Sequence, residues 1–141
     1  MDEAARVSDA VELGHRTGFV LLATADTSGV PNLAVANIIE HISEDRLAVS
    51  SWFCPNTIAN LKRNPHLDVV VWDSETDEGY QILGTAEQVT ETAVIDGYVP
   101  EDPQSRRRLA QTEQEVRVKV EKVLSFARTP YCDVTAGKQG T

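Results

Sequence analysis

Apolar and polar residues follow two different periods along the chain. Residues 2–16 have the period of a helix, and their apolar positions at three- and four-residue spacing are Val7, Ala10, Val11 and Gly14. That spacing places the apolar residues on one side of a helix, so the pattern predicts an amphipathic helix with one stripe against a core.

From Gly18 onward the pattern is that of β-strands. Apolar or alternating segments of strand length are separated by turn residues such as Asp26-Thr27-Ser28-Gly29. The expected strands cover residues 18–25, 31–42, 46–52, 66–73, 79–89 and 116–126. We expect the first three to form an antiparallel meander, Gly84 to mark a bulge, and about six antiparallel strands to close into a barrel, which removes sheet edges.

Helical segments interrupt the strand pattern twice. Asn56 or Cys54 is suited to begin a short helix with Pro55 in its first turn, and Asn64-Pro65 is suited to end it. Residues 92–114 are expected to be mainly helical. The tail, residues 129–141, is expected to be poorly ordered unless a partner holds it.

Length and composition indicate one globular domain. The 141 residues are 41% hydrophobic and 25% charged. We expect a single domain over 1–141, with a helix at 1–17, a barrel with inserted helices at 18–128, and a tail at 129–141.

Charge and residue content argue against several functional classes. The net charge of −9 argues against nucleic acid as the main partner. No apolar run is long enough for a membrane span and no signal peptide is visible, so we expect a cytoplasmic protein with no membrane partner. The three histidines are scattered without metal-ligand spacing, which predicts no metal site.

Three motifs in a fixed order carry a resemblance to a known family. They are the hairpin ATADTSGVP, the segment T-x-x-N-L-x-x-N-P formed by Thr57, Asn60, Leu61, Asn64 and Pro65, and the strand GYQILGTAE. Over residues 18–89 the chain resembles the FMN-binding split barrel of pyridoxamine 5'-phosphate oxidase-like proteins.

The resemblance implies a mainly β fold, a split barrel with flanking helices, that works as a homodimer with FMN at the subunit interface. In such proteins the flavin phosphate lies near the short helix and the ring lies over the second and third strands. The cofactor-binding residues that the resemblance indicates are Val35, Ala36, Asn37, Ser50, Ser51, Trp52, Asn56, Thr57 and Ile58.

The resemblance places the phosphate of the flavin at the short helix. Backbone N–H groups of Asn56, Thr57 and Ile58 at a helix start would bind an anion, and the Thr57 hydroxyl would add a hydrogen bond. The alternative is that Asn56 and Thr57 only cap the helix. Family members commonly carry Lys or Arg where this chain has Asn56. Lys62 and Arg63 lie further along the helix, where they can point away from the phosphate. The candidates to neutralise it in their place are Arg117, Lys119 and residues 106–108, and the alternative for these arginines is a solvated helix face.

Two of the residues expected to contact the flavin ring have alternative roles. The Asn37 side chain would hydrogen-bond the flavin or satisfy a neighbouring strand end. Trp52 would stack on the flavin, or it would belong to the core or a dimer contact.

No residue has the setting of an activated nucleophile or general base, which agrees with chemistry carried by a cofactor. The sequence therefore indicates an FMN-binding flavoprotein, an oxidoreductase with an unknown substrate and a small-molecule or nicotinamide electron donor. The alternatives are a non-catalytic FMN-binding or electron-transfer protein, a deazaflavin-dependent reductase, and an empty barrel that serves as an interaction module.

Overall fold

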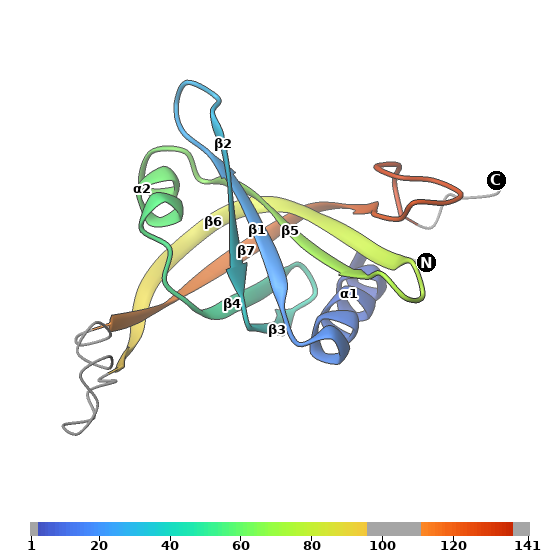
Figure 1. Ribbon diagram of the computed structural model, residues 1–141, viewed down its shortest axis with the longest axis horizontal. Coiled ribbons are helices and arrows are strands. Elements are labelled where there is room, and N and C mark those ends of the chain that lie inside the picture. Colours follow the sequence, from blue (N-terminus) through green and yellow to red (C-terminus); the bar gives the residue numbers. More distant parts are fainter. Residues whose placement is uncertain (1–2, 96–110, 137–141) are drawn as a thin grey trace.

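The computed structural model describes residues 3–95 and 111–136, and in them two helices accompany a strongly twisted sheet (Figure 1). The helices are α1 (Glu3–Thr17) and α2 (Pro55–Arg63). The strands are β1 (Val20–Ala25), β2 (Pro31–Ala36), β3 (Ile38–Ser43), β4 (Arg46–Trp52), β5 (His66–Asp73), β6 (Glu78–Ile95) and β7 (Gln111–Ser125). The mainly β split-barrel architecture is confirmed, with seven strands in place of about six.

The sheet is antiparallel and has the order β2-β1-β5-β6-β7-β4-β3. One expected strand, residues 31–42, is in fact two, because the chain breaks at Asn37. β2 pairs with β1, whereas β3 pairs with β4 at the opposite edge of the sheet. The expected three-strand meander is therefore wrong: a single residue carries the chain from one edge of the sheet to the other.

The expected helix at 92–114 is wrong wherever the structure describes it. Residues 92–95 continue β6 and residues 111–114 begin β7, and the two strands pair as far as Ile95 opposite Gln111. The hydrogen-bonded ladder of this long ribbon outweighs local helix preference. The rest of the expected helix, residues 96–110, lies outside the described residues.

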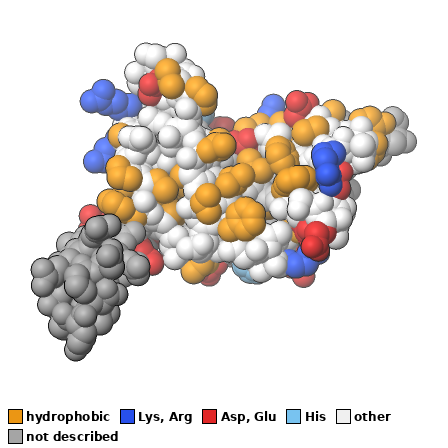
Figure 2. Space-filling model, viewed as in Figure 1, with side chains coloured by type: hydrophobic (Ala, Val, Ile, Leu, Met, Phe, Trp, Pro, Cys, Tyr) orange, Lys and Arg blue, Asp and Glu red, His pale blue; other side chains and the backbone are white. Residues whose placement is uncertain are grey.

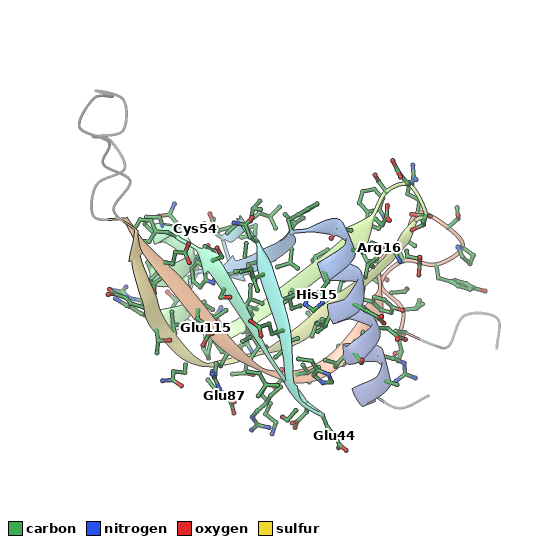
Figure 3. The ribbon with its side chains drawn as sticks, turned by 90° about the horizontal axis from the view of Figure 1, so that it is seen from below. His15, Arg16, Glu44, Cys54, Glu87 and Glu115 are labelled. Carbon is green, nitrogen blue, oxygen red and sulfur yellow. The ribbon has the colours of Figure 1, made fainter. Side chains whose placement is uncertain are left out.

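Alternating side chains of the strands fill the barrel, and α1 covers one end of it. The apolar stripe of α1 is buried as predicted, with Val7 and Ala10 fully inaccessible. The helix lies so close to β3 that a Cβ on Gly14 would stand 2.6 Å from Cγ2 of Ile39. Figure 3 shows α1, with His15 and Arg16, on the other side of the barrel from Cys54. One end of the barrel is thus occupied by α1, and α2 lies away from it.

Gly84 marks a bulge in β6, as predicted. The register with β7 shifts between Leu83 and Gly84. At Gly84 the backbone of β7 comes so close that a Cβ would overlap the Lys119 carbonyl oxygen. The glycine is therefore required by the close approach of two backbones.

The described part of the tail is held against the barrel, contrary to the expectation of disorder. Ala136 is buried, and the Asp133 N–H donates to the Ser125 carbonyl. The Asp77 carboxylate accepts hydrogen bonds from the backbone N–H groups of Arg128 and Thr129, and these bonds lower the pKa of Asp77 to about 2. These hydrogen bonds join the β5–β6 turn to the chain after β7.

Candidate functional site

The start of α2 has backbone donors that the helix itself does not use. Cys54 is the N-cap residue but makes no side-chain capping bond, and Pro55 has no N–H. The N–H of Ile58 donates to the Cys54 carbonyl at 3.1 Å. Helix geometry therefore leaves the N–H groups of Asn56 and Thr57 as the two free donors. Of the three predicted backbone donors, Ile58 is already engaged.

The polar residues of the T-x-x-N-L-x-x-N-P segment fasten α2 to the sheet. The Asn32 amide donates to Oγ1 of Thr57 at 3.1 Å, and the Asn60 amide donates to Oγ1 of Thr24 at 3.0 Å. The Asn64 amide donates to the Ala25 carbonyl at 3.3 Å. These bonds connect α2 to β1 and β2, so the motif fixes the position of the helix.

Thr57 consequently has a different place from the one expected. Its side chain is fully buried, and its hydroxyl oxygen faces Asn32. The hydroxyl oxygen of Thr57 is thus engaged inside the chain, and its contact with a phosphate stays a prediction. The backbone N–H of Thr57 keeps its free position in the first turn.

A cavity of about 640 Å³ lies beside α2. Its lining residues are Asp26, Thr27, Phe53, Pro55, Ile58, Ala59, Asn60, Lys62 and Arg63. Lys62 and Arg63 bring two positive charges to its wall. The Asp26 carboxylate, which also lines it, is engaged by the backbone N–H groups of Ser28 and Val30. The cavity is thus a concave space whose wall holds two cationic side chains, and the free donors Asn56 and Thr57 are on the same helix but not in its lining.

Arg117 and Lys119, the other candidate cations in the described part of the chain, do not line this cavity. Arg117 forms an ion pair with Glu115 at 3.3 Å on β7, and Lys119 lies exposed on the same strand opposite Arg46. Residues 106–108 lie outside the described residues. Among the described basic residues that the sequence analysis named, Lys62 and Arg63 line this cavity. Their common position in the last turn of α2, where both are exposed, is the signal that could have identified them.

The predicted ring residues meet where β2 ends and β4 ends. The Asn37 amide donates to the Ser51 carbonyl at 3.3 Å, so of its two expected roles the structure shows the satisfaction of a neighbouring strand. Ser51 has a left-handed backbone with φ of 64°, and its hydroxyl donates to a Glu113 carboxylate oxygen at 3.4 Å. A non-glycine residue in this conformation is strained, and such strain is frequent near functional sites.

The remaining ring residues differ in accessibility. Val35 is 54% exposed on the outer face of β2, and Ser50 is half-buried. Ala36 is fully buried. Trp52 is also buried, at 3% exposed, and its indole N–H donates to the Val49 carbonyl. Trp52 is thus a core residue in this structure.

The outer face of β2 is apolar and exposed. Leu33 is 68% exposed and Val35 is 54% exposed, and both point away from the barrel core. Figure 2 shows hydrophobic side chains gathered in the middle of this side of the molecule. Soluble monomers rarely leave such side chains contiguous, so the face has the character of a contact surface.

Metal and membrane signals are absent from the described residues. Among residues 3–95 and 111–136, no group of three or more His, Cys, Asp and Glu side chains is arranged to hold a metal ion. In the same ranges no helix is long and apolar enough to cross a membrane.

The comparison with protein families decides what kind of protein carries this site. The family model of pyridoxamine 5'-phosphate oxidase matches residues 8–126. The chain belongs to the pyridoxamine 5'-phosphate oxidase family. No curated protein matches the sequence.

Solved structures confirm the fold of this family member. A protein related to general stress protein 26, of the pyridoxinephosphate oxidase family from Clostridium acetobutylicum, is 14% identical with a TM-score of 0.64, over 96% of this chain and 97% of that one. An FMN-binding protein from Syntrophomonas wolfei is 18% identical with a TM-score of 0.60, over 89% and 88% of the two chains.

The same fold also occurs in proteins described by other cofactors. An F420 reductase is 17% identical with a TM-score of 0.53, over 79% of this chain and 93% of that one. HutZ, the heme storage protein from Vibrio cholerae, is 15% identical with a TM-score of 0.53, over 89% and 95% of the two chains. The fold alone therefore leaves the cofactor of this family member open.

Proposed function

We propose that this member of the pyridoxamine 5'-phosphate oxidase family binds FMN and acts as an oxidoreductase. The observation that carries the proposal is the cavity beside α2, whose wall holds two cationic side chains, Lys62 and Arg63, on a helix whose first turn has two free backbone donors. A bound flavin would supply hydride or electron transfer, and the protein would supply binding and orientation.

The residues present fit the phosphate end of such a cofactor. The N–H groups of Asn56 and Thr57 are suited to an anion at the helix start. Lys62 and Arg63 would compensate both for Asn56, which stands where relatives carry a cation, and for the acidic chain as a whole. The Thr57 hydroxyl is assigned to the packing of α2 and not to the ligand.

The ring end fits an exposed apolar surface that a second chain would cover. Leu33 and Val35 provide apolar area on β2, and a flavin ring requires an apolar slot of this kind. We propose that a second copy of the chain packs on this face and encloses the flavin. In sedimentation, the protein is expected to have twice the mass of one chain at micromolar concentration, and a monomer at that concentration would contradict the dimer.

Removal of the two cations tests the phosphate site. Lys62→Ala and Arg63→Ala are each expected to raise the FMN dissociation constant about tenfold, because each removes one charge-assisted contact. The measurement is flavin fluorescence titration of the cofactor-free protein. Lys122→Ala is the matched control, since Lys122 is exposed on β7 outside the cavity and its loss changes the net charge equally.

The nature of the chromophore tests the proposal as a whole. Protein purified from its producing cells and then denatured is expected to release FMN, identified by mass. Release of F420 or heme would contradict FMN as the cofactor. Equal FMN affinity in all three variants and the unaltered protein would remove the cavity beside α2 from the site.

A further inference from the structure

The outer face of the sheet carries two neighbouring rows of side chains, and each row crosses β2, β1, β5, β6 and β7. The strand registers give the first row as Val35, Leu21, Val70, Gln81 and Leu124. They give the second row as Leu33, Ala23, Asp68, Leu83 and Lys122. The residues that alternate with them, such as Leu22, Val69 and Ile82, belong to the core, so both rows point away from it. We call these two sets the outer rows, and most of their residues are apolar.

One carboxylate stands in the middle of this apolar face. Asp68 lies in the second row between Ala23 of β1 and Leu83 of β6. One of its carboxylate oxygens is buried and has no hydrogen-bond partner among residues 3–95 and 111–136. A charged carboxylate without water or a partner is unfavourable, so such a group holds its proton more tightly. Burial accordingly raises the pKa of Asp68 to about 6.

A second copy of the chain is the partner that the outer rows fit. Leu33 and Val35, on which the proposed dimer rests, begin the two rows, so the rows continue the same contact face. A two-fold dimer brings the same patch of both subunits together, and an apolar patch complements itself. Asp68 and Lys122 give the outer rows no net charge, although the whole chain has a net charge of −9. Two copies can therefore meet here with less repulsion than through an acidic part of their surface.

We propose that the two subunits pack through their outer rows and that Asp68 enters this contact as a neutral acid. Each subunit whose Asp68 is ionised then takes up one proton from the solvent as the dimer forms. The inference rests on the dimer of the proposed function, and it adds that acid strengthens this dimer.

The direction of the pH effect follows from the loss of water around the carboxyl group. A covering subunit removes further water from Asp68, which disfavours its charged form still more. Below about pH 6 Asp68 is protonated before the subunits meet, so the dimer is expected to be strongest there. As the pH rises above this value, each subunit must first regain a proton, and the dimer is expected to weaken.

The other groups around Asp68 do not produce the same trend. Its neighbours on β1 and β6, Ala23 and Leu83, are uncharged. His66 on β5 and Lys122 on β7 are the charged or titratable side chains nearest to it in the strand register. A covered imidazole favours its neutral form, so His66 would strengthen the dimer at high pH, and a lysine keeps its charge throughout this range.

Sedimentation equilibrium of the full chain as purified, at pH 5.5 and pH 8, measures the dimer dissociation constant. This constant is expected to rise at least about tenfold between the two pH values. Asp68→Asn keeps the shape of the neutral acid without its titratable proton, so its dimer is expected to be as tight at pH 8 as at pH 5.5. Glu44→Gln is the matched control and is expected to keep the tenfold change, since Glu44 is exposed in the β3–β4 turn and its substitution removes the same charge.

A second measurement needs no variant. Dilution calorimetry of the unaltered protein at pH 7, in two buffers of different ionisation enthalpy, is expected to show that dissociation of the dimer releases protons. A dimer with equal dissociation constants at both pH values, an unchanged pH dependence in Asp68→Asn, or dissociation without proton release would overturn the role of Asp68 and leave the proposed dimer standing. A monomer at both pH values would overturn the dimer itself, so failure of the two proposals is distinguishable.

Discussion

Gly84→Ala is expected to lower the free energy of unfolding by about 3 kcal/mol, a large effect for one methyl group. The added Cβ would overlap the Lys119 carbonyl oxygen and stand 2.7 Å from Cγ1 of Val118. The obstacle is backbone of β7, which cannot rotate away as a flexible side chain would. Relief would require the bulge in β6 to open and its ladder with β7 to shift.

Denaturant unfolding followed by fluorescence measures this change. The control is Gly29→Ala, because Gly29 has a φ of +86° and nothing within 4 Å of its hypothetical Cβ. That substitution incurs only the left-handed backbone penalty, about 1 kcal/mol. A cost at Gly84 no greater than the cost at Gly29 would show that the bulge adapts and that the close approach of the two strands is not essential.

Asp68→Asn is expected to stabilise the protein by about 2 kcal/mol at pH 7 and to leave its stability near pH 4 almost unchanged. Asp68 lies on β5 between Ala23 of β1 and Leu83 of β6, on the face opposite the barrel core. One of its carboxylate oxygens is buried with no hydrogen-bond partner in the described part of the chain. Burial in this setting raises the pKa of Asp68 from 3.8 to about 6.

The direction of the pH effect follows from that raised pKa. Between about pH 4 and pH 6 the folded protein keeps the Asp68 proton that the unfolded chain has released, so stability falls as the pH rises through this window. Above pH 6 the folded state holds a desolvated charge. The charged or titratable side chains nearest to Asp68 in the strand register are His66 on β5 and Lys122, which pairs with Leu83 on the β7 side of β6.

Urea unfolding at pH 4 and pH 7 tests the assignment. Glu121→Gln is the control, because Glu121 is exposed on β7 and its replacement removes the same charge. If the two substitutions had equal effects at both pH values, the pH dependence would come from general charge repulsion and not from the burial of Asp68.

The sequence predicted the fold well where local pattern and tertiary structure agree. The stripe of α1, the alternation of Val116, Val118 and Val120, and the glycine at the bulge all follow from periodicity. The break at Asn37 could not be predicted in this way, because residues 31–42 have an uninterrupted strand pattern and only the pairing partners separate β2 from β3. The β6–β7 ribbon was missed for the same reason, since its strands stabilise each other across a long chain separation.

For the candidate site, the sequence located the region but not the role of each residue. The Thr57 segment does form the helix beside the cavity, yet its conspicuous polar side chains hold the helix to β1 and β2. The contact of Thr57 with a ligand therefore stays a prediction, whereas its role in holding the helix is seen in the structure. Lys62 and Arg63 were recognised as cations, but their place in the cavity wall depends on how α2 is rotated about its axis. That rotation is fixed by the hydrogen bonds that connect α2 to β1 and β2.

The position of β7 between β6 and β4 has a consequence for how the protein is made. β3 and β4 form a hairpin of neighbouring residues, but that hairpin joins the rest of the sheet only through the pairing of β4 with β7. During synthesis, the hairpin must therefore wait while some sixty further residues emerge before it gains a lasting neighbour on its inner side. In that interval both long sides of the hairpin can pair with other nascent chains, and the arrival of β7 closes the side that β4 presents.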